Sequence, residues 1–150
     1  MTTSFPSYRQ FIVEIKQILE NATTIAVVGC SPRTSRPSHR IAKYLQKSGF
    51  SVIPVNPYHE ELLGERCYPD LQSIPDDIEL DIVDIFRRAA FTPDVVNDAI
   101  ERAQATGRHP VIWTQIGVHN EQARKIAEDA GFTYIRNRCL MVEHDKMAAV

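Results

Sequence analysis

The sequence predicts an α/β fold, a doubly wound parallel sheet of about five strands with helices on both faces. Short apolar runs rich in valine and isoleucine alternate along the chain with amphipathic segments of helical spacing. The runs are almost continuously apolar, as strands that are buried on both faces require. Strand, helix and strand repeated in this order favour parallel strands joined by right-handed crossovers.

The strands and helices follow from these runs and from the turn residues between them. The expected strands are Thr24–Val28, Ser51–Val55, Leu80–Phe86, Pro110–Thr114 and Thr133–Ile135. The expected helices between them are Arg36–Ser48, Asp94–Thr106 and Asn120–Ala130, followed by Gly49, Gly107 and Gly131. Prolines at positions 37 and 93 suit a first helical turn, and Ser35 and Thr92 are the expected caps.

Another helix, Tyr8–Asn21, is expected before the first strand. Its apolar side chains at helical spacing would face inward, namely Phe11, Ile12, Ile15, Ile18 and Leu19. The longest irregular stretch is Asn56–Asp77, and neither a repeat nor a linker divides the chain. We therefore expect one domain over residues 1–150.

Composition narrows the class of protein. Hydrophobic residues make up 43% and charged residues 24% of the 150, which are ordinary globular values. A net charge of −2 lacks the excess of positive charge that non-specific binding to nucleic acids or membranes requires. No apolar run approaches the roughly 18 residues of a membrane span, and we see no signal peptide. The cysteines, Cys30, Cys67 and Cys139, form neither a disulfide framework nor a zinc motif. We expect a cytoplasmic protein without a metal site, and its oligomeric state is left open.

The turn after the first strand is the expected ligand site, since such sheets bind ligands at the carboxyl ends of their strands. Gly29 ends the strand, and small polar residues then lead into a helix whose first N–H groups attract anions. Arg33 and Arg36 add guanidinium groups suited to phosphate. The alternative is a tight turn with solvated arginines, and we favour phosphate binding.

The turn differs from a dinucleotide fingerprint. Ser31 and Thr34 stand where the pattern G-x-G-x-x-G needs its second and third glycines. Asn56 ends the second strand where an acidic residue would hold the ribose of NAD. NAD is therefore disfavoured. Arg87 and Arg88 end the third strand, either as ligand contacts or as exposed cations.

The motifs in this order resemble the small CoA-binding domain proteins, relatives of the N-terminal CoA-binding domain of the succinyl-CoA ligase alpha subunit. The resemblance covers roughly residues 8–145 and is carried by Val28-Gly29-Cys30-Ser31, Arg36-Pro37-Ser38, Ile53-Pro54-Val55-Asn56-Pro57, Asp81-Ile82-Val83-Asp84-Ile85-Phe86-Arg87, Trp113-Thr114-Gln115-Ile116-Gly117 and Arg138-Cys139. It implies a Rossmann-like fold that binds CoA or an acyl-CoA. The ligase's histidine-bearing second domain and its partner subunit have no counterpart here, so binding without catalysis is what the resemblance implies.

The resemblance also implies roles for individual residues. The loop Gly29–Arg33 and the helix start Arg36–Ser38 would hold the phosphates, Asn56 and Pro57 would border the adenosine, and the ends of the third and fourth strands would line the remainder. The expected binding residues are Gly29, Cys30, Ser31, Pro32, Arg33, Arg36, Ser38, Asn56, Pro57, Phe86, Arg87, Gln115 and Gly117.

Two cysteines leave a catalytic alternative open. Cys30 in the ligand loop could pair with the CoA thiol, although free cysteines more often pack, which we favour. Cys139, near Glu143 and His144, is either a nucleophile or a buried residue on an edge strand, and we favour the latter. The alternatives to CoA binding are thus an acyl-CoA-processing enzyme with a cysteine nucleophile and an NAD(P)-sensing module.

Overall fold

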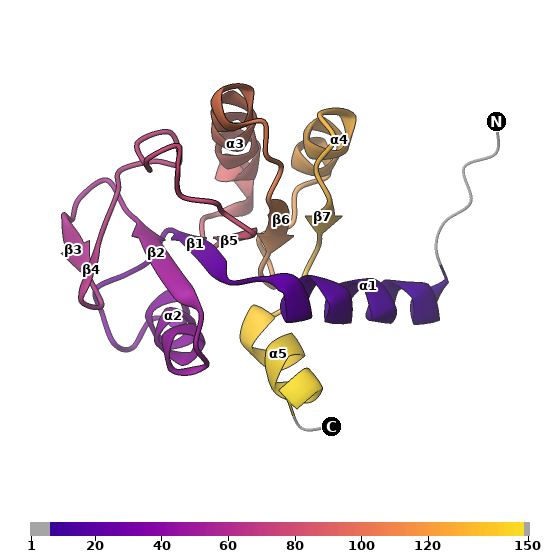
Figure 1. The fold of residues 1–150 in the computed structure, drawn as a ribbon, viewed down its shortest axis with the longest axis horizontal. Coiled ribbons are helices and arrows are strands. Elements are labelled where there is room, and N and C mark those ends of the chain that lie inside the picture. The colour runs from indigo at the N-terminus through magenta and orange to yellow at the C-terminus, as the bar shows by residue number, and fades with distance from the viewer. Residues whose placement is uncertain (1–6, 149–150) are drawn as a thin grey trace.

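The computed structural model describes residues 7–148 and contains a five-stranded sheet in the order β2-β1-β5-β6-β7 (Figure 1). Its strands are β1 (Thr24–Val28), β2 (Ser51–Val55), β5 (Ile82–Ile85), β6 (Val111–Thr114) and β7 (Tyr134–Ile135). All neighbouring strands in this sheet pair in parallel. The winding reverses between β1 and β5, so the expected doubly wound sheet is confirmed.

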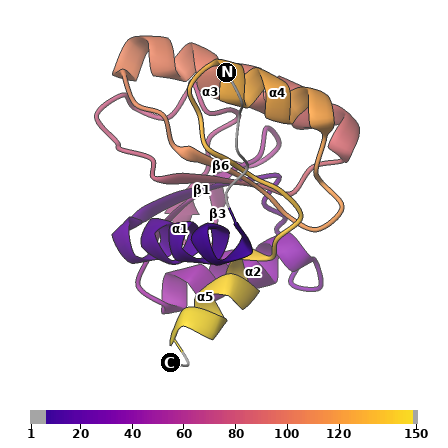
Figure 2. The ribbon, with the colours of Figure 1, turned by 90° about the vertical axis from the view of Figure 1, so that its right-hand side faces the viewer.

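Helices cover both faces of the sheet, as Figure 2 shows. On one face lie α3 (Thr92–Thr106) and α4 (Glu121–Asp129); on the other lie α1 (Tyr8–Asn21), α2 (Pro37–Lys47) and α5 (Leu140–Ala148). A 3-10 turn, Ala89–Phe91, leads into α3. Among residues 7–148, no helix is long and apolar enough to cross a membrane.

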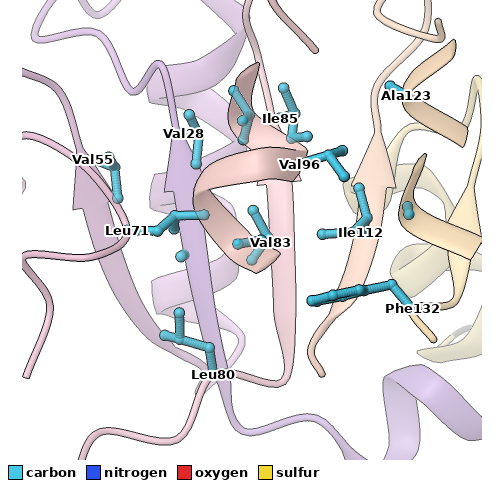
Figure 3. Close-up of a cluster of buried hydrophobic side chains, with 14 of the residues drawn as sticks. Val28, Val55, Leu71, Leu80, Val83, Ile85, Val96, Ile112, Ala123 and Phe132 are labelled. Carbon is cyan, nitrogen blue, oxygen red and sulfur yellow. The ribbon is translucent and has the colours of Figure 1, made fainter. Parts of the chain in front are cut away.

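The sheet has an apolar core on each face because successive strand side chains point to opposite sides. Along β1, Ala26 and Val28 pack beneath α3 and α4, whereas Ile25 and Val27 pack on the side of α1, α2 and α5. Figure 3 shows the first of these cores, where side chains from neighbouring strands meet Val96 of α3. This two-sided burial is why the strand sequences are continuously apolar.

Helix α1 has the expected bounds and begins with a capping box between Ser7 and Gln10. Fewer of its apolar side chains are buried than its sequence predicts. Ile15 and Leu19 are buried, but the Ile12 side chain is exposed, so its inward assignment was wrong. Figure 1 shows the reason, since the first half of α1 extends beyond the β7 edge and has no sheet beneath it.

Two expected helix caps are also wrong. Arg36 and Phe91 occupy the N-cap positions of α2 and α3, and neither makes a side-chain capping bond. Thr92 is instead the first residue of α3, and its buried hydroxyl donates to the Val118 carbonyl at 2.8 Å. That bond ties the start of α3 to the segment after β6. The glycines expected after α2, α3 and α4 all have positive φ.

Other differences lie in segments without a clear periodicity. The stretch expected to be irregular contains a short antiparallel hairpin, β3 (Glu61–Leu62) with β4 (Glu65–Arg66). The same region is held by Arg102, whose buried guanidinium donates to the carbonyls of Leu71, Ile74, Pro75 and Ile78. The chain after β7 forms α5 instead of an edge strand.

Candidate functional site

A cleft of about 780 Å³ opens at the carboxyl edge of the sheet, where β1, β5 and β6 end. The turn between β1 and α2 forms one side, and the ends of β5 and β6 and the start of α5 form the other. The lining residues are Gly29, Ser31, Arg33, Arg36, Pro37, Ser38, Arg40, Ile41, Phe86, Gln115, Ile116, Val118, Cys139 and Met141. The cleft therefore lies at the position where sheets of this winding bind ligands.

Gly29 brings the turn after β1 close to the neighbouring strand. Its φ is +83°, and a Cβ at this position would lie 2.8 Å from the Phe86 carbonyl oxygen. Its N–H donates to the Val55 carbonyl at 2.9 Å. A side chain here would strain the backbone and separate β1 from β5, so the cleft floor requires glycine.

The rest of the turn is ordered by its own hydrogen bonds. The Ser31 N–H donates to the buried Ser38 hydroxyl at 3.0 Å, and the Ser31 hydroxyl accepts from the Arg33 N–H at 3.1 Å. From behind, the Asn56 amide donates to the Cys30 carbonyl at 2.9 Å. These intramolecular bonds fix the backbone of the turn, so its conformation is preorganised.

Arginines give the cleft a cationic rim. Arg33 and Arg36 lie on it, as their place in the turn predicts, and Arg40 joins them from one helical turn further along α2. The arginine ion pairs within residues 7–148 involve Arg108, Arg124 and Arg138, so no carboxylate there neutralises the rim. Arg36 is also the N-cap residue of α2, and its side chain makes no hydrogen bond to the first turn of that helix. The rim and the helix start together suit an anionic group.

The opposite wall is mostly apolar. Phe86, Ile116 and Met141 line it, and Ile41 of α2 adds a further apolar side chain to the cleft; Ile116 is largely exposed although it is hydrophobic. Phe86 was expected at the site, and Ile116 belongs to the Gln115–Gly117 turn that was expected to line it, whereas Ile41 and Met141 were not expected. The helical positions of Arg40 and Ile41 relative to Arg36 were a usable signal, whereas Met141 depends on how α5 packs.

Several expected binding residues lie outside the cleft wall. Asn56 supports the turn from behind, as described above, and Pro57 lines a separate hollow with Tyr58. The Arg87 guanidinium lies over the Phe91 ring at 4.7 Å from its centroid. Pro32 is exposed and Gly117 follows the lining residue Ile116, but neither lines the cleft.

Cys30 packs in the core, as favoured from the sequence, whereas Cys139 lies in an environment that the sequence did not predict. Cys30 is fully buried in the core beneath α2, and its burial, together with neighbouring Cys67, raises the pKa of its thiol to about 12. This keeps the thiol protonated and unsuited to nucleophilic attack. Cys139 is half-buried and lines the cleft immediately before α5, so its assignment to a buried edge strand was wrong.

Hydrogen bonds place Cys139 but do not activate it. The Trp113 indole N–H donates to the Arg138 carbonyl at 2.8 Å, which ties this segment to β6. Glu143 forms an ion pair with Arg138, and His144 Nδ1 lies 2.9 Å from the Tyr44 hydroxyl. Both candidate bases are therefore engaged by other residues.

A buried polar pair lies behind the cleft. Asp84 of β5 is fully buried, and the Gln115 side-chain amide donates to its Oδ1 at 2.8 Å. Burial raises the pKa of the Asp84 carboxyl to about 8, although the bond from Gln115 opposes the shift. Asp84 Oδ2 has no partner within residues 7–148. Sequence reasoning noted Gln115 but not its link to Asp84.

The fold and the cleft define a class of protein: a doubly wound α/β domain in which the turn after the first strand has arginines and a helix start that suit an anion. The family model that matches is the CoA binding domain, and it covers residues 23–145. The chain belongs to this family, and the resemblance seen in its motifs is confirmed.

The chain is similar to two kinds of protein: one that it matches over nearly its whole length, and ligases that it matches over a small part of theirs. The chain is 40% identical over 131 residues to the uncharacterized protein YneT of Bacillus subtilis, covering 87% of this chain and 92% of that protein. It is 30% identical over 81 residues to ADP-forming acetate–CoA ligase II of Archaeoglobus fulgidus. That match covers 53% of this chain but 12% of the ligase.

Solved structures show the same fold. A hypothetical protein from Pyrococcus horikoshii OT3 superposes with a TM-score of 0.85 at 36% identity, with 99% of each chain covered. An acetyl-coenzyme A synthetase of Ca. Korarchaeum cryptofilum gives a TM-score of 0.66 at 22% identity, covering 81% of this chain and 27% of the synthetase. The second match supports the fold alone.

Proposed function

We propose that this protein binds CoA or an acyl-CoA in the cleft, without catalysing a reaction of its own. The observation that carries the proposal is the pairing of an unneutralised arginine rim with an apolar wall in one cleft at the carboxyl edge of the sheet. CoA combines the matching chemistries, since its diphosphate is anionic and its pantetheine arm has methyl and methylene groups between its amides. Membership of the CoA-binding domain family supports the same ligand.

The preorganised turn explains how the diphosphate would be held. Arg33 and Arg36 would contact the phosphate oxygens, and the first N–H groups of α2 would add donors aligned with the helix dipole. Ser31 and Ser38 are already bonded to each other, so they would shape the turn. In this assignment Asn56, Pro57, Arg87 and Gly117 serve as supports or neighbours of the site.

Thermal unfolding with CoA, 3′-dephospho-CoA and NAD tests the proposal. A ligand that binds only the folded state at 100 times its Kd adds about 2.7 kcal/mol. We therefore expect CoA to raise the Tm by roughly 5–10 °C. We expect a smaller rise with 3′-dephospho-CoA and little with NAD. Absence of any shift with CoA at millimolar concentration would contradict the proposal, and a larger shift with NAD would favour an NAD(P)-sensing module.

A second candidate function is thioester exchange, in which the Cys139 sulfur bonds to the acyl carbon, the acyl–sulfur bond of the acyl-CoA breaks, and CoA leaves as a thiol with the proton that Cys139 gives up. One observation favours it, the position of Cys139 in the cleft wall. Its test is alkylation by iodoacetamide, followed residue by residue with mass spectrometry. Rapid labelling of Cys139 that CoA blocks would favour this enzyme, whereas labelling no faster than that of a simple thiol would exclude it. Buried Cys30 serves as the internal reference for an unreactive thiol.

The cysteines bear on the compartment. All three are free in the structure, and none has a disulfide partner. We propose a cytoplasmic location, which three free cysteines support because reducing compartments keep thiols unpaired. No group of histidine, cysteine or acidic residues within residues 7–148 is arranged to hold a metal ion.

A further inference from the structure

The buried pair behind the cleft joins two neighbouring strands at their carboxyl ends. Asp84 lies on β5 in register with Trp113 of β6, and Gln115 follows β6 directly. Asp84 is completely buried and Gln115 is 5% exposed, yet Gln115 lines the cleft. A change at position 84 can therefore reach a ligand only through a neighbour such as Gln115.

The hydrogen bond fixes which end of the Gln115 carboxamide faces the ligand. Its Nε2 donates to Asp84 Oδ1, which directs the amino side into the protein. Its carbonyl oxygen makes no hydrogen bond within residues 7–148. Within residues 7–148, Asp84 Oδ2 is the only buried side-chain nitrogen or oxygen atom without a hydrogen-bond partner, so Gln115 Oε1, which also has none, is not enclosed. The cleft thus presents a fixed hydrogen-bond acceptor at the end of β6.

The position of this acceptor matches the path of an extended ligand. An anion bound at the β1–α2 turn would lie at one end of that path, and Phe86 at the end of β5 comes next. Gln115 is one strand further along. Parallel strands are roughly 4.8 Å apart, so Gln115 lies roughly 10 Å across the sheet from the end of β1. A pantetheine arm leaving the diphosphate in this direction carries amide N–H groups over that distance.

We propose that Asp84 is a positioning residue, which holds the Gln115 carboxamide so that Oε1 accepts a hydrogen bond from an amide N–H of the pantetheine arm. This inference rests on the proposed function and deepens it. The Asp84–Gln115 pair would thus favour nucleotides that carry a pantetheine arm over nucleotides that have only the phosphates and adenosine. Without Asp84, nothing would fix which end of the Gln115 carboxamide faces the ligand, and Oε1 would no longer be held toward the cleft.

The test compares affinities for CoA and for adenosine 3′,5′-bisphosphate, which lacks the arm, by isothermal titration calorimetry. We expect Asp84→Leu and Gln115→Met to weaken CoA binding by roughly 5–10-fold, the loss of one hydrogen bond. The affinity for the bisphosphate should change less than about twofold, an amount below the loss of one such bond. Asp84→Asn retains an acceptor for the Gln115 amide and should retain CoA affinity.

A double variant separates positioning from a general effect on the fold. In the background of Gln115→Met, Asp84→Leu should have no additional effect on CoA affinity, because the residue through which it acts is absent. Additive losses, or an equal loss for CoA and the bisphosphate, would overturn the inference. Equal wild-type affinities for the two ligands would overturn it while leaving the proposed function intact. A wild-type protein that binds neither would instead contradict the proposed function itself.

Discussion

Replacing both Arg33 and Arg36 with alanine is expected to reduce CoA affinity by about 100-fold or more, the largest effect on binding that we predict. Each guanidinium can make charge-assisted hydrogen bonds to phosphate, worth roughly 1.5–3 kcal/mol apiece. Both side chains line the cleft, and neither is engaged by a carboxylate within residues 7–148. Their removal therefore subtracts from binding without breaking an ion pair of the fold. Titration calorimetry with CoA measures the loss.

The matched control is Lys43→Ala with Lys47→Ala. These exposed lysines belong to the same helix, α2, but do not line the cleft. The control removes the same formal charge, so it separates direct contact from a general change in potential. We expect it to change CoA affinity less than about threefold, since exposed charges are screened. Both double variants should unfold at nearly the wild-type Tm without ligand. Equal losses of affinity in the two variants would contradict direct contact.

Stability should fall as the pH rises toward 8, and Asp84→Asn should remove most of that fall. The pKa of the Asp84 carboxyl is about 8 in the folded protein because the group is buried, and its ordinary value is 3.8. Between these values the unfolded chain loses the proton while the folded protein retains it. The unfolding free energy therefore decreases with pH, by up to about 1.4 kcal/mol per unit. Below the ordinary pKa the contribution is fully present, and it is lost once the pH exceeds about 8.

Urea unfolding of the wild type and of Asp84→Asn across this pH range measures the effect. Asparagine stays neutral and can accept the Gln115 bond, so the variant should become more stable than the wild type in alkaline solution. Asp77→Asn at an exposed position is the control and should follow the wild-type pH profile. Parallel profiles for the wild type and Asp84→Asn would show that the buried carboxyl does not govern this dependence.

Much of the architecture could be predicted because its signals are local. The bounds of α1, β1 and β2 agree with the sequence prediction, since apolar periodicity and turn residues determine where such elements begin and end. Helix α5 could not be predicted this way. Its residues Leu140–Ala148 mix polar and apolar side chains, and its two buried members are Leu140 and Glu143. A carboxylate is buried there because Arg138 pairs with it, which only the folded chain provides.

Some residues of the candidate site could be predicted from local sequence signals, and others could not. Gly29, Arg33 and Arg36 were identifiable because a strand end, a glycine and a helix start lie together in the sequence. Cys30 and Cys139 were harder to place. A residue adjacent to Gly29 points into the core, and one more than a hundred positions away lines the cleft. Side-chain direction at a strand end follows from the pleat and the packing of helices, and neither is encoded by proximity in the chain.

Local sequence patterns were enough to predict the alternation of strands and helices, the burial of the sheet on both faces and the position of the turn after β1 that lines the cleft. Each of these depends on residues within a few positions of one another. Three features came only from the tertiary structure: the start of α5 lines the cleft, Arg102 binds the carbonyls of a distant loop, and Asp84 accepts a hydrogen bond from Gln115. These features join segments far apart in the chain, and they exist only because the strand order brings those segments within hydrogen-bonding distance.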